Sequence, residues 1–325
     1  MNLLSNSRRA ISLAALALAS LPTLADSYPN QPLRVIVPFP PAGGTDIVTR
    51  MVTGKIAETT HWTFVIDNKA GAGGNIGLDA VAKSKPDGYT LGVGQTANLA
   101  INPTLYAKIP YDALKDFTPI ALLAAQPVVL VVRSESPYKT LADLVAAAKA
   151  KAGSVTLASA GNGTVGHLAG EGFARRAGVK FTHIPYKGAG PALTDLLGGQ
   201  TDFMFATPQG ALPQIQGGKL RALAVTSAKR IAVLKDVPTI AESGYKGFEA
   251  TDWKALLAPA GTPADLVKRL NAEVEKALKQ PETIAKLNAE GSEALGGSPQ
   301  RFADFLKTEH ARWGALVKES GAQVD

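Results

Sequence analysis

Cysteine is absent from this sequence of 325 residues. Without it the chain forms no disulfide, no thiolate metal site, no lipidated N-terminal cysteine and no cysteine nucleophile. Histidine is also scarce, and His61, His183 and His310 show no metal-ligand spacing with one another. We therefore predict that the protein has no metal site and no cofactor.

Long apolar runs are missing beyond the first 25 residues. The longest remaining stretch, Pro119 to Val132, is interrupted by Gln126-Pro127 and is too short to span a bilayer. Lys and Arg number 34 against 27 acidic residues, but they form no run and no basic stripe interleaved with aromatic residues. Nucleic acid is therefore a poor candidate as a partner, and anionic small molecules are a better one.

The first 25 residues have the pattern of an export signal. Arg8 and Arg9 precede an uncharged apolar run from Ala10 to Leu21, and Thr23-Leu24-Ala25 ends in small residues typical of a cleavage site. We interpret residues 1–25 as a cleaved signal peptide, and we expect the mature protein in the periplasm. Removal of the two arginines lowers the formal net charge from +7 to +5.

Strand and helix patterns alternate along most of the mature chain. This alternation predicts α/β lobes with largely parallel sheets, and helical spacing prevails after Trp253. A short helix is expected over Asn75–Ala82, and helix starts are expected at Thr140, with Asp143 completing a capping box, and at Ser298-Pro299. Because no low-complexity linker separates two halves, we expect two lobes joined by crossing strands at Leu122–Pro127 and Ala250–Leu257. The predicted first lobe comprises residues 26–124 and 252–325, and the second comprises residues 125–251.

Two stretches combine an apolar strand, a glycine turn and the start of a helix. In the first, Val35–Val37 runs into Gly43-Gly44, and Thr45 or Asp46 is expected to cap the following helix. In the second, Val155–Ser159 runs into Gly161-Asn162-Gly163-Thr164. A helix start has unpaired N–H groups and a partial positive charge, so such a unit suits a carboxylate or phosphate. The alternative is that each is only the tight turn that any α/β unit needs.

Several longer motifs resemble one family of receptors over nearly the whole mature chain. They are VPFPPAGGTD from Val37, NKAGAGGNIG from Asn68, DGYTL from Asp87, NPTLYAKIPYD from Asn102, DFTPI from Asp116, HIPYKGAGPALTDLLGGQTD from His183, VPTIAESGY from Val237 and LLAPAGTP from Leu256. The chain resembles the Bug family, the extracytoplasmic solute-binding receptors of tripartite tricarboxylate transporters. It departs from the family at Ala42, where many members have glycine, and at Lys254-Ala255, where glycine is commoner in the second position.

The resemblance implies a fold, a function and partners. The fold is that of a two-lobed periplasmic binding protein of the Venus flytrap, type II-like class, with the ligand cleft between α/β lobes. The receptor is expected to act as a monomer, to close on a small organic carboxylate and to deliver it to the membrane permease of its transporter. Neither enzymatic activity nor nucleic-acid binding is implied.

The resemblance also places the ligand between the two glycine loops. A carboxylate held by backbone N–H groups and hydroxyl groups needs no arginine. The expected ligand-binding residues from the loops and from the ends of neighbouring strands are Phe39, Gly43, Gly44, Thr45, Asp46, Gln95, Thr96, Ser159, Gly161, Asn162, Gly163, Thr164, His167 and Thr207.

Some of these residues have a second interpretation. Gln95 and Thr96 can equally form an ordinary solvated turn, and Phe39 can belong to the core. Asp46 is better suited to capping its helix than to touching an anion. His167, in the first turn of its helix, can either donate to the ligand as a neutral ring or pack in the interior with a hydrogen bond to the backbone.

The rival function comes from Gly161-Asn162-Gly163-Thr164-Val165-Gly166, a GxGxxG match after a strand. It would suit an exported NAD-dependent oxidoreductase. However, the next strand ends at Ile184-Pro185-Tyr186-Lys187, which offers no acidic residue for the ribose. No GxSxG or HExxH motif supports a hydrolase either. We therefore expect a carboxylate receptor and no enzyme.

Overall fold

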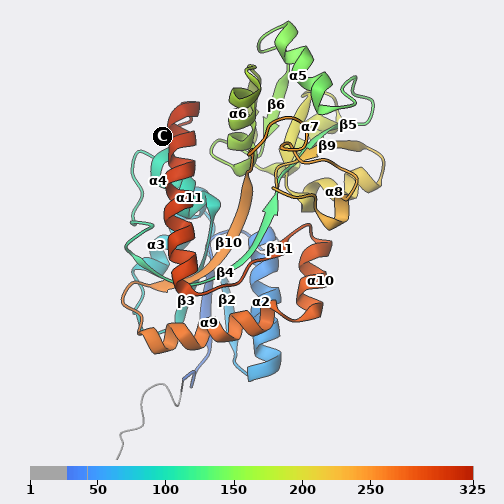
Figure 1. Ribbon diagram of the computed structural model, residues 1–325. Coiled ribbons are helices and arrows are strands. Elements are labelled where there is room, and N and C mark those ends of the chain that lie inside the picture. Colours follow the sequence, from blue (N-terminus) through green and yellow to red (C-terminus); the bar gives the residue numbers. More distant parts are fainter. Residues whose placement is uncertain (1–27, 42, 325) are drawn as a thin grey trace, which may run out of the picture.

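The computed structural model describes residues 28–41 and 43–324. The predicted signal peptide (1–25) and Ala42 lie outside the described residues. The described chain forms two sheets, each covered by helices, which occupy the lower and upper parts of Figure 1. The predicted two-lobed α/β architecture is confirmed.

The lower sheet has six strands in the order β11-β4-β10-β3-β1-β2. Strand β1 is parallel to its two neighbours, β2 and β3, whereas β10 runs antiparallel to both β3 and β4. The bounds are β1 Leu33–Val37, β2 Phe64–Asn68, β3 Thr90–Gln95, β4 Phe117–Pro127, β10 Thr251–Pro259 and β11 Glu293–Ala294.

The upper sheet has five strands in the order β7-β6-β8-β5-β9. Strand β6 is parallel to β7 and β8, and β5 is antiparallel to β8 and β9. The bounds are β5 Val129–Arg133, β6 Thr156–Ser159, β7 Thr182–Pro185, β8 Phe203–Ala206 and β9 Leu220–Val225. Both sheets are therefore mixed, and the expectation of largely parallel sheets was wrong, because the strands that enter and leave the upper part run against their neighbours.

The strands β4 and β10 carry the chain between the two parts. They pair with each other from Thr251 opposite Pro127 to Pro259 opposite Phe117, and in Figure 1 both run from the lower sheet toward the upper one. The predicted crossing segments lie in these strands or at their ends. The exact lobe bounds stay a prediction, but each strand of the upper sheet falls within residues 125–251.

Ten α-helices and three further short helical segments complete the part of the chain that the structure describes. They are α2 Gly44–Thr60, η1 Ala72–Gly74, α3 Asn75–Ala82, η2 Ala97–Ile101, α4 Asn102–Leu105, α5 Leu141–Ala150, α6 Val165–Ala177, α7 Ala189–Leu197, α8 Pro208–Gln216, η3 Ala232–Leu234, α9 Ala264–Leu278, α10 Pro281–Ala289 and α11 Pro299–Ser320. The sequence predicts two of the helix starts correctly. Thr140 and Asp143 form a reciprocal capping box at α5, and the Ser298 hydroxyl accepts from the Arg301 N–H at α11.

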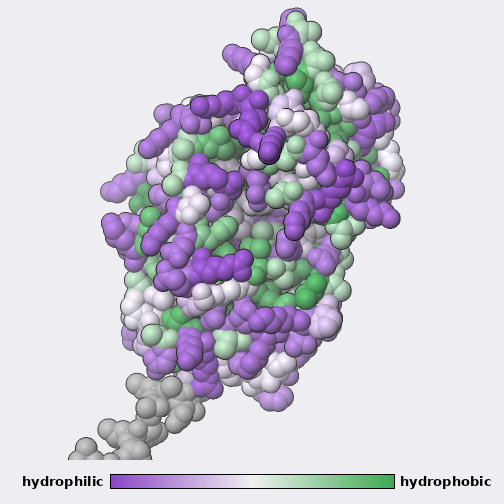
Figure 2. Space-filling view, in the orientation of Figure 1, coloured by the Kyte–Doolittle hydropathy of each residue, from purple (hydrophilic) through white to green (hydrophobic). Residues whose placement is uncertain are grey.

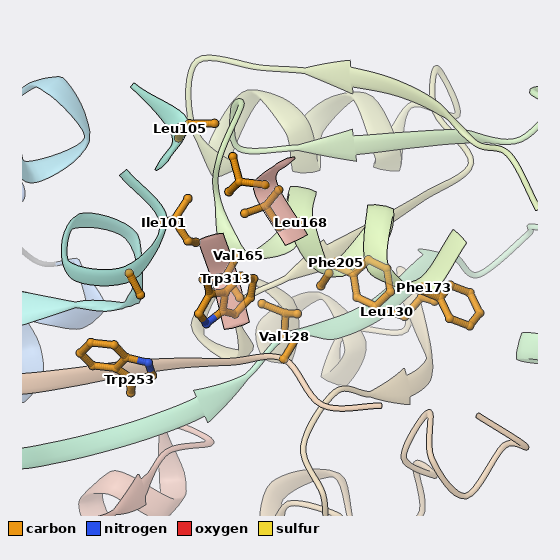
Figure 3. Close-up of a cluster of buried hydrophobic side chains, with 14 of the residues drawn as sticks. Ile101, Leu105, Val128, Leu130, Val165, Leu168, Phe173, Phe205, Trp253 and Trp313 are labelled. Carbon is orange, nitrogen blue, oxygen red and sulfur yellow. The ribbon is translucent and has the colours of Figure 1, made fainter. Parts of the chain in front are cut away.

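A continuous apolar core runs through the crossing. Figure 3 shows Ile101 and Leu105 of the lower part near Val165 and Leu168 of the upper part, within one cluster of buried side chains. Trp253 of β10 belongs to it, and its indole N–H donates to Glu309 Oε2 at 2.8 Å. The indole of Trp313 donates to the same oxygen at 2.9 Å, so one buried carboxylate ties α11 to the crossing strand.

The outer surface is mostly polar. Figure 2 shows hydrophilic side chains over the visible face, with apolar residues in small separate patches. Among the described residues, no helix combines the length and the hydropathy needed to cross a bilayer.

Candidate functional site

The two glycine loops occupy equivalent places in the two sheets. The first, residues 39–46, follows the carboxyl end of β1 and leads into α2, and the second, residues 159–164, follows β6 and leads into α6. In α/β folds the loops at the carboxyl ends of parallel strands are where ligands bind. Each loop therefore delivers the N-terminus of a helix to the region where the two sheets face each other.

The start of α2 differs from the prediction. Gly43 is the N-cap, the helix begins at Gly44, and no side chain caps it. The expected cap by Thr45 or Asp46 was wrong, because both residues lie inside the first turn. The Thr45 hydroxyl donates instead to Gln95 Oε1 at the end of β3. Among the described residues, no side chain accepts from the N–H of Gly44 or Thr45 in the first turn of α2.

Asp46 is held in a small polar network. Its carboxylate accepts from Arg50 Nε at 2.9 Å and from Asn68 Nδ2 at 3.0 Å, and its side chain is 4% exposed. The same Asn68 amide donates to the Phe39 carbonyl at 3.0 Å, which fixes the start of the loop. Asp46 therefore organises the loop, and its negative charge is neutralised by Arg50.

Phe39 is half-buried, and its ring lies close to Gly74, where η1 leads into α3. A Cβ built on Gly74 would lie 3.0 Å from Phe39 Cζ and 2.6 Å from Asn98 Nδ2, so only glycine fits between these side chains. Asn98 is fully buried and its Oδ1 accepts from the Gln95 N–H at 2.9 Å. Among the described residues Asn98 Nδ2 has no hydrogen-bond partner.

Gln95 and Thr96 have different surroundings although they are adjacent. Gln95 is half-buried and contacts the first loop through Thr45. Thr96 is fully buried, and its hydroxyl donates to the Thr251 carbonyl at 3.3 Å and accepts from the Trp253 N–H at 2.9 Å. Thr96 thus joins β3 to the crossing strand β10. The interpretation of these residues as a solvated turn was wrong for Thr96.

In the second loop the hydroxyl groups bond within the loop. Ser159 is fully buried and its Oγ accepts from the Gly161 N–H at 3.2 Å. Thr164 is the N-cap of α6, where its Oγ1 accepts from the His167 N–H at 3.3 Å and donates to the Gly161 carbonyl at 2.8 Å. These bonds shape the loop and leave backbone N–H groups as its remaining donors.

His167 packs in the interior. Its Nδ1 accepts from the Gly163 N–H at 3.1 Å, and its ring stacks on that of His183 with 3.8 Å between centroids. Burial, helped by the neighbouring His183, lowers the pKa of His167 to about 3, and burial lowers the pKa of His183 to about 4. Both rings are neutral at pH 7, as the sequence predicts for His167. The His183 Nε2 also hydrogen-bonds Ser159 Oγ at 2.7 Å.

The side chains of Thr207 and Asn162 take less part in hydrogen bonds within the protein. Thr207 precedes α8, is half-buried, and has no hydrogen-bond partner for its hydroxyl among the described residues. Asn162 is exposed at the tip of the second loop. These two are the predicted residues of the upper part whose side chains remain available to a ligand.

The two parts meet close to both loops. A Cβ on Gly44 would lie 3.8 Å from Gln126 Nε2 and 3.9 Å from Gln209 Cδ, and Gln209 Nε2 donates to Gln126 Oε1 at 2.7 Å. On the other side Gly163, with φ +73°, lies so close to Leu105 that an added Cβ would sit 1.9 Å from Leu105 Cδ2. The sequence motifs do not single out Gln126, which the structure places beside the start of α2. Its only signal is a polar side chain within the apolar stretch Pro119–Val132.

Within residues 28–41 and 43–324 the structure contains no group of three or more His, Asp or Glu side chains placed to hold a metal ion.

The comparisons with known proteins agree on one family. The model of the tripartite tricarboxylate transporter family receptor matches residues 48–322. BugT of Bordetella pertussis is 38% identical over 304 residues, which cover 93% of each chain.

Solved structures give the same result. A protein of R. palustris solved with adipate is 36% identical, with a TM-score of 0.83 over 91% of this chain and 100% of the other. MatC of Rhodopseudomonas palustris, with bound malate, is 35% identical, with a TM-score of 0.78 over 89% and 100%. The comparisons give no support to the oxidoreductase alternative. The chain therefore belongs to the tripartite tricarboxylate transporter receptor family, the Bug proteins, and is a solute-binding receptor.

Proposed function

We propose that this receptor works in the periplasm, captures a small organic carboxylate between the loops 39–46 and 159–164, and delivers it to the permease subunits of its transporter. The observation that carries the proposal is the uncapped start of α2 at Gly43-Gly44, placed where the two sheets face each other. The related proteins solved with adipate and malate support a carboxylate as the ligand. The residues 1–25 are its export signal, and it acts as a monomer.

The donors available match this chemistry. The N-termini of α2 and α6 each carry about half a positive charge, and α2 has no side-chain cap. We assign a side-chain contact to Thr207 and a wall contact to Phe39, while Thr45, which donates its hydroxyl hydrogen to Gln95, positions that amide at the site. Ser159, Thr164, Thr96 and His167 then act by holding the loops in shape. A charged hydrogen bond contributes about 1.5 to 3 kcal/mol, so four or five of them are sufficient for micromolar binding, which needs about 8 kcal/mol net of ordering costs.

Capture proceeds by closure of the two lobes about the crossing strands. The open and closed forms differ by a few kcal/mol, and a ligand that bonds both loops at once makes the closed form dominant. Small-angle scattering of the free and saturated protein measures this directly. A smaller radius of gyration on saturation is expected, and an unchanged radius would contradict closure.

Thermal unfolding against a panel of mono-, di- and tricarboxylates, amino acids and aromatic acids tests the ligand class, with NAD and NADH as the negative arm. A ligand at a hundred times its Kd adds about 2.7 kcal/mol to the free energy of unfolding, which raises Tm by several degrees. A shift with one group of carboxylates supports the proposal. A shift with the dinucleotides alone would overturn it.

Two threonines of the upper part provide a matched pair for the site. Thr207→Val removes an unpartnered hydroxyl, and we expect it to weaken carboxylate binding about tenfold. Thr194→Val is the control, since its exposed hydroxyl only donates to the Gly190 carbonyl at 3.1 Å within α7. Equal affinity of both variants, measured by calorimetry, would remove Thr207 from the site.

A further inference from the structure

The crossing strand β10 contains a buried ion pair that the proposed function does not use. Lys254 Nζ donates to Asp252 Oδ2 at 2.8 Å, and the two side chains are 1% and 13% exposed. The residues next to Lys254, Trp253 and Ala255, belong to the apolar core. Apolar residues in place of a buried ion pair are often equally or more stabilising, so stability alone does not account for this pair.

Sheet register places the pair beside the candidate site. Lys254 is opposite Gln95 of β3, and Asp252 is opposite Gln126 of β4. Residues directly opposite in an antiparallel pair share a face of the sheet, and so do residues two apart on one strand. The ion pair therefore lies on the same face as Gln95, which accepts from Thr45 of α2, and as Gln126, which accepts from Gln209 of the upper part.

The pair also has unused hydrogen-bonding capacity. Among the described residues Asp252 Oδ1 is buried and has no hydrogen-bond partner. An ammonium group has three donors, and the described bond of Lys254 uses one of them, to Asp252 Oδ2. An orphaned carboxylate oxygen in the interior is costly, which indicates that a donor occupies that place in the working protein.

We propose that Asp252 and Lys254 select ligands in which a hydrogen-bond donor stands on the carbon next to a carboxylate. The inference rests on the proposed function: the carboxylate bound at the start of α2 also accepts from Lys254, and the neighbouring hydroxyl or ammonium group donates to Asp252 Oδ1. The paired charges cancel, so a bare carboxylate gains little from Lys254 while Asp252 stays unsatisfied. A 2-hydroxy or 2-amino acid satisfies both residues.

The test compares acids that differ only at that carbon. The probes are the series succinate, malate and aspartate, the series glutarate, 2-hydroxyglutarate and glutamate, and the series 3-phenylpropionate, phenyllactate and phenylalanine. In the series that binds, we expect the hydroxy or amino acid to have a Kd at least tenfold below that of the unsubstituted acid. Which of the two is preferred distinguishes a hydroxyl from an ammonium donor.

Asp252→Asn removes the acceptor's charge and keeps its size. We expect the preference to fall below threefold, chiefly through a lower Kd of the unsubstituted acid, because Asp252 no longer cancels the charge of Lys254. Asp67→Asn is the control. It removes a carboxylate on the edge strand β2 that pairs with Arg34 of β1, and this variant should keep the ligand preference of the wild type. The double variant Asp252→Asn/Lys254→Met leaves no unpaired charge at this position, so it should fold and lose the preference even if the single variant is unstable.

The outcomes separate this inference from the proposed function. Binding of an unsubstituted acid as tightly as its hydroxy and amino forms would overturn the inference and leave the receptor function intact. An unchanged preference in both Asp252 variants would do the same. If no carboxylate of the series or of the wider panel binds the wild type, both proposals fail.

Discussion

The two glycine loops have the same sequence pattern but are built differently. In the loop before α2, the helix has no side-chain cap and the polar side chains bond to neighbouring elements, Asp46 to Arg50 and Asn68, and Thr45 to Gln95. In the loop before α6, Thr164 caps the helix and bonds with Ser159 and His167 converge on the loop itself. A glycine turn can therefore be held by bonds to neighbouring elements or by bonds within the loop. Only the loop before α2, which is held by neighbouring elements, leaves its helix start without a side-chain cap.

The largest difference is expected between two glycines. Gly163→Ala places a Cβ at φ +73°, 1.9 Å from Leu105 Cδ2, so backbone strain and overpacking together should cost about 2 to 4 kcal/mol. Gly43→Ala has φ −78° and meets only the Pro40 carbonyl at 3.4 Å, so it should cost less than about 1 kcal/mol. Urea unfolding of both variants measures the contrast, and equal stabilities would contradict the account of the second loop.

The second difference is a dependence on pH that only the second loop should show. The pKa of His167 is about 3 in the folded protein and about 6.5 when unfolded, so between these values the unfolded state binds more protons. Stability is therefore fully present above pH 6.5 and falls as the pH drops. Between pH 7 and pH 5 the loss from His167 is about 2 kcal/mol, and His183, whose pKa is lowered to about 4, adds to it.

Urea unfolding at several pH values checks this expectation. His167→Gln should weaken the dependence between pH 7 and pH 5. If the stability of the wild type does not fall between pH 7 and pH 5, the lowered pKa values of the stacked His167 and His183 are contradicted.

The smallest difference concerns two threonines. Thr164→Ala removes an N-cap and should cost about 1 kcal/mol of stability. Thr45→Ala removes no cap, so it should affect carboxylate binding more than stability. Measurements of Tm and of the Kd for the carboxylate test both variants. A loss of affinity in Thr164→Ala together with a loss of stability in Thr45→Ala would contradict the roles given to the two loops.

The sequence predicts elements well where local signals suffice. Asn75–Ala82 is a helix with the predicted bounds, and the capping box at Thr140 is present, because glycine turns and side-chain caps act within a few residues. The family resemblance supplied the two-lobed architecture. Mixed sheets were not foreseen, because strand direction depends on partners distant in sequence.

The candidate site is harder to read because the same residue types serve two purposes. A threonine after a glycine turn is equally suited to cap a helix or to hold a ligand, and only the helix start decides that Thr164 caps while Thr45 does not. Gln126 and Lys254 gain their importance from register across β4 and β10, which local pattern does not encode.

The ladder between β4 and β10 has a mechanical consequence. Two separate connections would let the lobes slide as well as rotate, but these two strands are hydrogen-bonded neighbours over most of their length and behave as one ribbon. Such a ribbon bends and twists more easily than it shears, so the upper part has essentially one axis to turn about. In the proposed closure, a loaded receptor would therefore differ from an empty one by a turn about that axis, a difference in shape that a membrane partner could recognise.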